Sequence, residues 1–292
     1  MALYQKCVST MNEYYLNMAG LNLVLQTPWE ITISDRMRPF LCEQSGDSPC
    51  YIRLCTCKSL PEMGKTGQWY GMAWYEQTPL GRQIFHCDKT GGTPFGMARL
   101  QPDGNVSLWV KEGCEGYFSG TAGIFNRIGP EALLLQHGAL LLHSSLVRFG
   151  GGAIVFAGPS GVGKSTQAAL WQQHLGAEVL NGDRTVLRCQ NEIWTGYGSP
   201  YAGTSGIYRN ESAPVGALVV LNQAKDNTLE RITAMQALRR CWPELSVHRW
   251  DQGFVEKSMD LFLRFAQQIP VYMLSCRPDR EAVLLLKEEL GL

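Results

Sequence analysis

The chain has 292 residues, and its 26 Lys and Arg balance 26 Asp and Glu, so its formal net charge is zero. Hydrophobic residues make up 45% and charged residues 18%, which excludes intrinsic disorder and predicts a large buried core. The balanced charge also excludes a globally basic nucleic-acid binder, and the length suits one large domain or two smaller ones.

The compartment is predicted from two absences. Residues 1–20 lack a basic patch followed by an apolar core and a small-residue cleavage site, so no signal peptide is expected. The longest apolar stretch, 132–147, is interrupted by polar side chains and is too short to span a membrane. We therefore expect a cytoplasmic protein. Its ten cysteines are expected to be free thiols, because the pair Cys55 and Cys57 has no partner pair at zinc spacing.

Residues 1–118 are predicted to form a β-rich region. Short alternating runs of apolar and polar residues are separated by turn sequences rich in Gly, Pro and Asp, which is typical of an antiparallel β meander or sandwich. These runs are 19–27, 50–57, 68–78, 82–88, 95–101 and 106–112.

The pattern changes in 119–292, where strands and helices are expected to alternate. Residues 124–146 have apolar positions at mixed helical spacing, and 153–157 form a short apolar run typical of a buried strand. A helix is predicted over 167–175 and ends at Gly176, a residue that suits a helix C-terminus.

The same alternation continues to the end of the chain. It predicts a buried strand over 217–221, a helix over 233–241 capped by Thr233, a helix over 258–268, a strand over 271–275 and a helix over 280–290. Such alternation favours an α/β fold for 119–292.

The strongest motif is a phosphate-binding loop of the Walker A type, G-x-x-x-x-G-K-[ST], between the strand 153–157 and the helix that follows. Its glycines allow backbone N–H groups to surround phosphate oxygens, Lys164 reaches the β- and γ-phosphates, and the Ser165 hydroxyl can ligate Mg²⁺. We therefore expect ATP and Mg²⁺ as cofactors. The predicted nucleotide-binding residues are Gly158, Pro159, Ser160, Gly161, Val162, Gly163, Lys164, Ser165 and Thr166.

A second G-K-T sequence occurs at Gly64, Lys65 and Thr66. The position five residues before Gly64 is Ser59 instead of glycine, and no strand leads into it. We interpret this segment as an ordinary turn.

Phosphoryl transfer also needs a carboxylate that binds metal or accepts a proton. Asp183 follows a buried-looking strand and lies nineteen residues after Lys164, which leaves room for one short helix and one return strand. Asp226 follows the strand 217–221 but lies beyond its end. Residues 222–226 also lack the N-K-x-D sequence that reads guanine, which disfavours a GTPase. Asp183 is the better candidate, although an exposed turn position remains its alternative.

Several of these segments together resemble the catalytic domain of the HPr kinase/phosphorylase family. They are residues 142–147, which match a His-containing strand of that family, the glycine-rich turn and phosphate loop (150–166) and the acid segment (180–183). The nucleotide site also resembles that of phosphoenolpyruvate carboxykinase. The segments 199–203 and 269–274 extend the likeness, which covers about residues 120–292.

The resemblance implies an α/β P-loop kinase domain of the HPr kinase and phosphoenolpyruvate carboxykinase type in 119–292. It implies that His143 lies beside the transferred phosphate and that Asp183 accepts the proton of an acceptor hydroxyl and joins Ser165 at the metal. It further implies that Arg209 clamps a phosphate. A core histidine and a surface arginine are the alternatives for His143 and Arg209. Gly182 stands where the family has the first acid of a pair.

The predicted function is an ATP- and Mg²⁺-dependent kinase that transfers the γ-phosphate to a hydroxyl acceptor, namely Ser or Thr of a small protein or peptide. Two alternatives stay open: a nucleotide-binding sensor or scaffold with a degenerate catalytic site, and a small-molecule kinase. The expected partners are a nucleotide and the acceptor, without nucleic acid or membrane. An oligomer is compatible with the sequence.

Overall fold

The computed structural model describes residues 11–292, which divide into a first compact unit that ends at His137 and a second unit, Gly138–Leu292. The sequence prediction placed this boundary between residues 118 and 119. Residues 1–10 of the predicted β-rich region lie outside the described part of the chain. Two short helices, α1 (Thr121–Phe125) and α2 (Pro130–Gln136), belong to the first unit.

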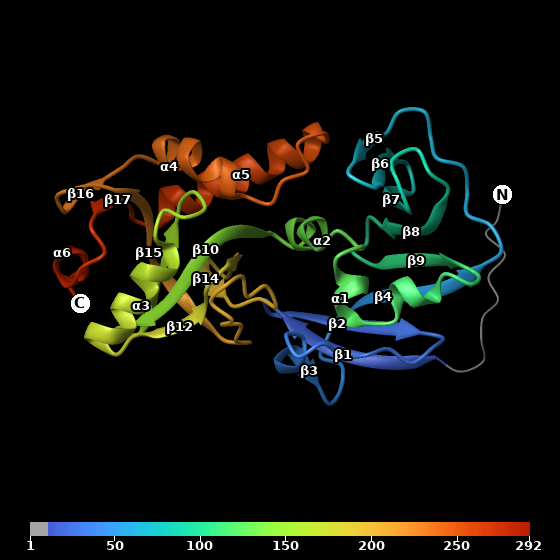
Figure 1. Ribbon diagram of the computed structural model, residues 1–292, viewed down its shortest axis with the longest axis horizontal. Coiled ribbons are helices and arrows are strands. Elements are labelled where there is room, and N and C mark those ends of the chain that lie inside the picture. Colours follow the sequence, from blue (N-terminus) through green and yellow to red (C-terminus); the bar gives the residue numbers. More distant parts are fainter. Residues whose placement is uncertain (1–10) are drawn as a thin grey trace. The chain divides into compact units, whose positions relative to one another are not determined.

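The first unit contains a nine-stranded sheet in the order β3-β1-β2-β4-β9-β8-β7-β6-β5 (Figure 1). Strands β5 to β9 form the predicted antiparallel meander, but β2 pairs with β4, and β4 with β9, in parallel. The purely antiparallel prediction is therefore wrong for the middle of the sheet. Long connections, 28–49 and 58–105, allow these strands to run in the same direction. The strands are β1 (Asn12–Met18), β2 (Leu21–Thr27), β3 (Leu41–Cys42), β4 (Cys50–Cys57), β5 (Gln68–Tyr70), β6 (Ala73–Thr78), β7 (Gly81–Cys87), β8 (Pro94–Leu100) and β9 (Val106–Lys111), with 3₁₀ helices η1 (Arg38–Phe40) and η2 (Glu115–Phe118).

The two cysteines of the C-x-C sequence lie on β4 and point to the same buried face. Cys55 and Cys57 pack with Phe85, Met97 and Trp109 in one apolar cluster. Burial raises the pKa of the Cys57 thiol to about 11, which keeps it protonated at neutral pH.

The second unit is built on an eight-stranded mixed sheet, in which β11, β15 and β17 are neighbouring parallel strands. Polar loops follow the C-terminal ends of all three strands, and this is the edge of an α/β sheet where ligands bind. The strands are β10 (Ala139–Phe149), β11 (Gly152–Ala157), β12 (Glu178–Asn181), β13 (Arg184–Gln190), β14 (Ile193–Tyr197), β15 (Ser212–Gln223), β16 (Thr228–Arg231) and β17 (Val271–Cys276). The helices are α3 (Lys164–Leu175), α4 (Ala234–Cys241), the 3₁₀ helix η3 (Trp242–Glu244), α5 (Gln252–Gln268) and α6 (Arg280–Glu289).

The helical spacing predicted over 124–146 is wrong beyond α2. Gly138 adopts a left-handed backbone conformation (φ 70°) that ends the helix, and the following residues form strand β10. This strand pairs with β11 on one side and with β12 and β13 on the other. A strand buried on both faces has a continuous apolar run, which spacing alone does not distinguish from a helix.

Two helix ends agree with the sequence prediction. Thr233 forms a capping box with Gln236 at the start of α4, and Gly176 ends α3 in a left-handed conformation. Helix α5 begins six residues earlier than predicted because Asp251 caps it by accepting a hydrogen bond from the Phe254 N–H. Strands β13, β14 and β16 were not predicted.

The core of the second unit follows the alternation of side chains along β15. Ala217, Val219 and Leu221 pack in one cluster with Trp171 of α3 and Leu286 of α6. The residues between them face the opposite side of the sheet. Figure 1 shows α4 and α5 together along one side of this sheet, away from α3. Helices α3 and α6 on one face and α4 and α5 on the other hold the ends of the strands in fixed positions. The loops that follow the strands are therefore held as well.

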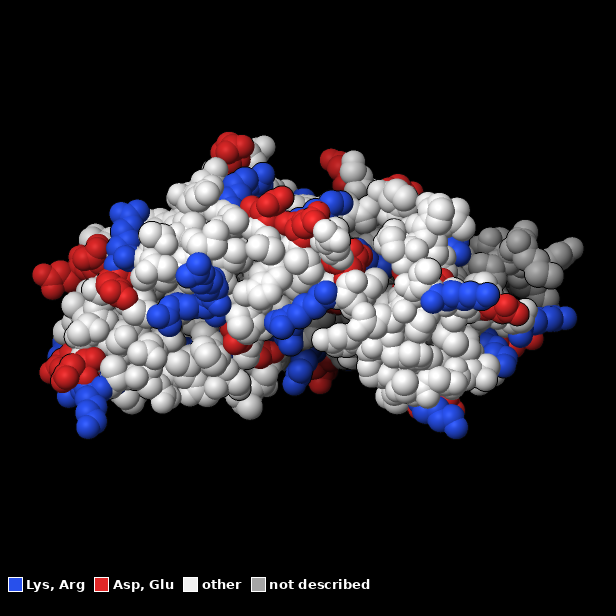
Figure 2. Space-filling model, turned by 90° about the horizontal axis from the view of Figure 1, so that it is seen from above, with Lys and Arg blue, Asp and Glu red and all other residues white. Residues whose placement is uncertain are grey.

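Two observations concern membrane-spanning helices and the distribution of surface charge. Within residues 11–292, no helix is both long and apolar enough to cross a membrane. On the face shown in Figure 2, acidic and basic side chains are interspersed instead of gathering into a patch of one sign.

Candidate functional site

The loop predicted to bind phosphate lies between the C-terminus of β11 and the N-terminus of α3, the place in the fold that the sequence predicted. Gly161 and Gly163 have φ angles of 80° and 114°, in the left-handed region that side chains disfavour. No neighbouring atom lies within 4 Å of a Cβ built on either residue, so backbone conformation, not crowding, requires glycine here. These turns bring the loop around to the start of α3, where free N–H groups favour an anion.

Lys164 begins helix α3 and is buried, with 6% of its surface exposed. Its ammonium donates hydrogen bonds to the carbonyl oxygens of Gly158 (2.7 Å) and Pro159 (3.2 Å), so it lies over the loop. Burial lowers the pKa of Lys164, and the negative charges of Glu244 and Asp183 act in the opposite direction. The lysine therefore lies within the field of two carboxylates that are distant from it in sequence.

Ser165 connects the loop to the acid segment. Its hydroxyl lies 3.5 Å from the carbonyl oxygen of Gly182, to which it can donate a hydrogen bond. Ser165 and Asp183 offer hydroxyl and carboxylate oxygens, the ligands that Mg²⁺ prefers in proteins. Among residues 11–292, no group of three His, Cys, Asp or Glu side chains is arranged to hold a metal ion. This donor set fits a nucleotide-bound Mg²⁺, which takes most of its ligands from phosphate and water.

Asp183 lies in a tight turn directly after β12, and Asn181 holds this turn in place. The buried Asn181 side chain accepts hydrogen bonds from the backbone N–H groups of Asp183 (2.9 Å) and Arg184 (2.7 Å). Its amide nitrogen donates to the carbonyl oxygens of Ser199 (3.0 Å) and Tyr201 (2.9 Å). These hydrogen bonds hold the backbone of the turn that carries Asp183.

His143 on β10 lies between two carboxylates. One ring nitrogen, Nε2, is 3.6 Å from Oδ1 of Asp183, and the other, Nδ1, is 2.7 Å from Oε2 of Glu244. The side chains of His143 and Asp183 are about a quarter exposed, whereas that of Glu244 is 11% exposed. His143 and Asp183, proposed from the sequence, are therefore neighbours, and the imidazole is oriented by hydrogen bonding to a third group.

Glu244 was missed by the sequence analysis. It is 101 residues from His143, at the end of the 3₁₀ helix η3 that follows α4. A Pro-Glu pair at a helix end carries no signal of chemistry, so only the fold brings this carboxylate to the site.

Gly182 precedes Asp183 in the turn after β12. A Cβ built on Gly182 would clash with the Ser205 side chain, so a larger residue at this position would require Ser205 to move. The second carboxylate beside His143 belongs to Glu244, from a different segment.

Arg209 is not brought together with His143 and Asp183. Its guanidinium lies 3.5 Å from Glu178 and 3.6 Å from Glu211, and Arg148 pairs with the same two carboxylates. Arg148 lies five residues beyond His143 on β10, which corresponds to about 17 Å along a strand. Because Arg209 shares its two carboxylate partners with Arg148, its guanidinium lies at that end of β10 and away from His143.

The arginine beside the acid is Arg184. Its Nε is 3.9 Å from Oδ2 of Asp183, a terminal nitrogen donates to the Ser246 hydroxyl (2.7 Å), and its guanidinium lies over the ring of Tyr201. Arg184, not Arg209, is therefore the arginine that lies beside Asp183.

Comparisons with known proteins give a distant likeness of fold. No protein-family model matches the chain, and no curated protein matches it. Among solved structures, it is similar to the HPr(Ser) kinase/phosphatase from Coxiella burnetii, with a TM-score of 0.31 and 13% identity. This match covers 52% of the present chain and 88% of the other.

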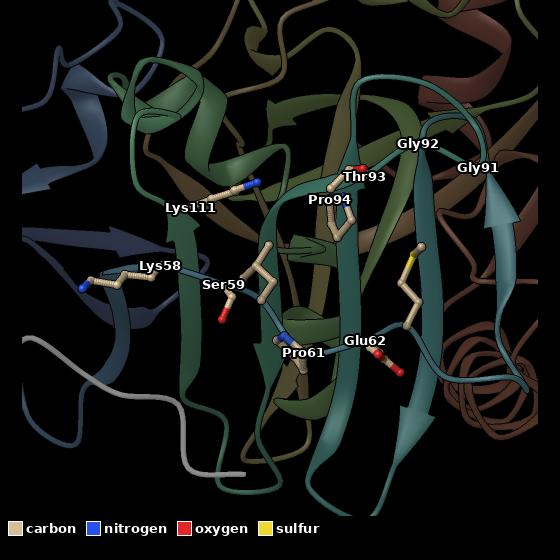
Figure 3. Close-up of a pocket in the computed structure, with 11 residues that line it drawn as sticks. Lys58, Ser59, Pro61, Glu62, Gly91, Gly92, Thr93, Pro94 and Lys111 are labelled. Atoms are coloured by element: carbon tan, nitrogen blue, oxygen red, sulfur yellow. The ribbon is translucent and has the colours of Figure 1, made fainter.

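The first unit has a hollow of its own, with a volume of about 480 Å³, beside the segment that follows β4. Its walls include Lys58, Glu62, Thr93 and Lys111, and Figure 3 shows Lys58 extending away from Glu62. No buried polar side chain is among the residues that line it. The second unit contains all the candidate site residues described above, namely His143, Lys164, Ser165, Asp183 and Glu244.

Proposed function

We propose that the protein is an ATP- and Mg²⁺-dependent kinase that transfers the γ-phosphate to a hydroxyl acceptor, Ser or Thr of a small protein or peptide. The observation that carries this proposal is that Asp183, His143 and Glu244 form a hydrogen-bonded and charged group, and that the turn with Asp183 meets the glycine-rich loop where the Ser165 hydroxyl lies 3.5 Å from the Gly182 carbonyl oxygen. A loop for phosphate alone would suit many nucleotide-binding proteins. The carboxylate beside it favours transfer chemistry.

In this proposal the loop binds the triphosphate and Asp183 prepares the acceptor. The acceptor oxygen attacks the γ-phosphorus, its proton passes to the carboxylate of Asp183, and the bond between the γ-phosphorus and the β,γ-bridging oxygen breaks to release ADP. The N–H groups of the loop and the ammonium of Lys164 stabilise the negative charge of the phosphates. Ser165 and Asp183 would hold Mg²⁺, which neutralises charge on the β- and γ-phosphate oxygens.

His143 and Glu244 act behind this proton transfer. The hydrogen bond from His143 Nδ1 to Glu244 fixes the plane of the imidazole, so that Nε2 faces Asp183. A fixed imidazole beside Asp183 keeps the carboxylate in one orientation. It also stabilises Asp183 by hydrogen bonding after the carboxylate has taken the proton of the acceptor hydroxyl. Arg184 offers a further cation beside the same carboxylate.

Replacing Asp183 tests the proposal. Purified Asp183→Asn protein, incubated with γ-labelled ATP and cell extract, should transfer phosphate about 10²- to 10⁴-fold more slowly than the wild type, because the proton acceptor is lost. ATP affinity, measured by calorimetry in buffer without Mg²⁺, should change little, because the loop that binds the triphosphate is intact. Asp226→Asn is the matched control, since Asp226 is an exposed acid beyond β15.

Two results would contradict the proposal. Undiminished transfer by Asp183→Asn would reject Asp183 as the proton acceptor. Tight ATP binding without a labelled acceptor in any extract would favour a nucleotide sensor, and a labelled metabolite would favour a small-molecule kinase.

A further inference from the structure

A hollow of about 460 Å³ opens beside the phosphate-binding loop, on the side of α3. Its walls come from three places that are far apart in sequence: the loop with the first turns of α3, the end of β15 and the end of β17. Because β15 and β17 run parallel to β11, their C-terminal ends lie at the same edge of the sheet as the loop. Its volume is within the range of small-molecule sites.

Gln167 lines this hollow and has an unused acceptor. The residue is 2% exposed, and its amide nitrogen donates to the Cys276 sulfur at 3.2 Å. Its carbonyl oxygen, Oε1, is buried and has no hydrogen-bond partner. Buried acceptors are rarely left unpaired, because they have lost their water without gaining a donor. Protein atoms enclose Oε1 in this structure, so an N–H donor of a ligand in the hollow would satisfy this oxygen once the Gln167 side chain turns toward the hollow.

Arg277 also lines the hollow, and neighbouring polar side chains hold it in place. Its Nε lies 2.9 Å from Asp279, and a terminal nitrogen lies 2.8 Å from Glu281. The backbone N–H of Arg277 donates to Asn227 at 2.9 Å. These contacts fix the plane of a half-exposed guanidinium, and a fixed guanidinium plane is a good stacking surface for a flat heterocycle.

The opposite wall is joined to the phosphate loop. The Gln223 side chain, at the end of β15, donates a hydrogen bond to the carbonyl oxygen of Gly161 at 3.1 Å. Thr166, the residue after the lysine and serine of the loop, also borders the hollow. A nucleotide whose phosphates occupy the loop would extend past Thr166 into this space.

We propose that this hollow is the nucleoside subsite and that it selects adenine. Oε1 of Gln167 accepts a hydrogen bond from the exocyclic amine of the base, and the Arg277 guanidinium stacks on the ring. This inference rests on the proposed nucleotide binding and adds which residues recognise the base. Inosine has an oxo group in place of the adenine amine, so it would place an acceptor against the acceptor of Gln167.

The experiment compares three ligands that cannot donate a phosphate to an acceptor in this reaction. Dissociation constants of ADP, IDP and inorganic pyrophosphate are measured by calorimetry in Mg²⁺ buffer. The wild type should prefer ADP over IDP about 3- to 10-fold, the value of one neutral hydrogen bond. Gln167→Leu should bind ADP correspondingly more weakly and lose this preference, while its pyrophosphate affinity stays unchanged.

Two further variants complete the design. Arg277→Lys keeps the charge and removes the stacking plane, so it should weaken ADP and IDP alike, about 3- to 10-fold, and spare pyrophosphate. Gln173→Leu is the matched control, because Gln173 is an exposed glutamine of the same helix. Melting temperatures within a few degrees of the wild type show that the variants are folded.

The outcomes separate the two proposals. If the wild type binds pyrophosphate and ADP but Gln167→Leu and Arg277→Lys leave ADP affinity unchanged, the hollow is not the nucleoside subsite and the phosphate loop stands. Equal affinity of the wild type for ADP and IDP would reject recognition of the amine. If the wild type binds none of the three ligands, the proposed function fails and the subsite fails with it.

Discussion

Each of the two units contains a G-K-[ST] sequence, and the two sequences have unlike structures. Gly64, Lys65 and Thr66 lie in an exposed loop between β4 and β5, where the Gly64 N–H donates to the buried carboxylate of Glu76. Gly163, Lys164 and Ser165 stand where a loop enters a helix, and Lys164 is buried over that loop. The chemistry of the motif depends on the strand before it and the helix after it, since these aim several N–H groups at one point.

The largest expected difference between the two units concerns their lysines. Lys164→Ala should lower the rate of phosphate transfer about 10²- to 10³-fold, because a preorganised donor to the phosphates is lost. Lys65→Ala, the matched control in the exposed loop, should transfer phosphate at the rate of the wild type. Single-turnover assays with γ-labelled ATP measure both. A comparable loss in both variants would show that the loop context does not separate the two sequences.

A smaller effect is expected for the carboxylate that only the fold brings to the loop. Glu244→Gln should lower kcat about 10- to 100-fold and leave KM for ATP nearly unchanged, because the imidazole loses its ionic partner while the phosphate loop stays intact. A purely structural role would not give this pattern, so the split between kcat and KM is the readout. Glu230→Gln, an exposed acid on β16, is the control. A normal kcat for Glu244→Gln would remove Glu244 and its contact with His143 from the mechanism.

The smallest effect concerns pH and the first unit. His86 is buried on β7, its Nε2 lies 2.8 Å from the Arg127 carbonyl oxygen, and burial lowers the pKa of His86 to about 4. The unfolded chain takes up a proton near the ordinary histidine value of 6.5, which the folded chain does not. Stability is therefore full above pH 6.5 and falls as the pH drops toward 4.

Between about pH 7 and about pH 5 this difference destabilises the fold by about 2 kcal/mol. Urea unfolding at a series of pH values, followed by tryptophan fluorescence, measures it. His86→Gln should be less stable at neutral pH but should lack this part of the pH dependence. An identical pH profile for the wild type and the variant would show that His86 is not the group responsible.

Much of the second unit was predictable because local signals are strong there. The helix ends at Gly176 and Thr233 are set by backbone geometry and capping hydrogen bonds within a few residues. The strand β10 was not predictable, since an apolar run that is buried on both faces has no alternation. The parallel pairing of β2, β4 and β9 in the first unit likewise depends on contacts between segments distant in sequence.

The site divides in the same way. The phosphate loop, Asp183 and His143 were proposed from the sequence, whereas Glu244 and the position of Arg184 became visible only in the fold. Arg209 had been expected at the phosphate, but its guanidinium is engaged by Glu178 and Glu211. Charge type is readable from a sequence, but the direction in which a long side chain points is decided by its neighbours in space.

The sequence by itself determined the glycine-rich loop that we propose binds phosphate, because that loop is made by consecutive residues whose backbone turns need glycine. Only the tertiary structure decided which acids and which arginine lie near this loop, and which amide there has an unpaired oxygen. These groups come from separate strands and helices, and the packing of the sheet against its helices determines where they meet.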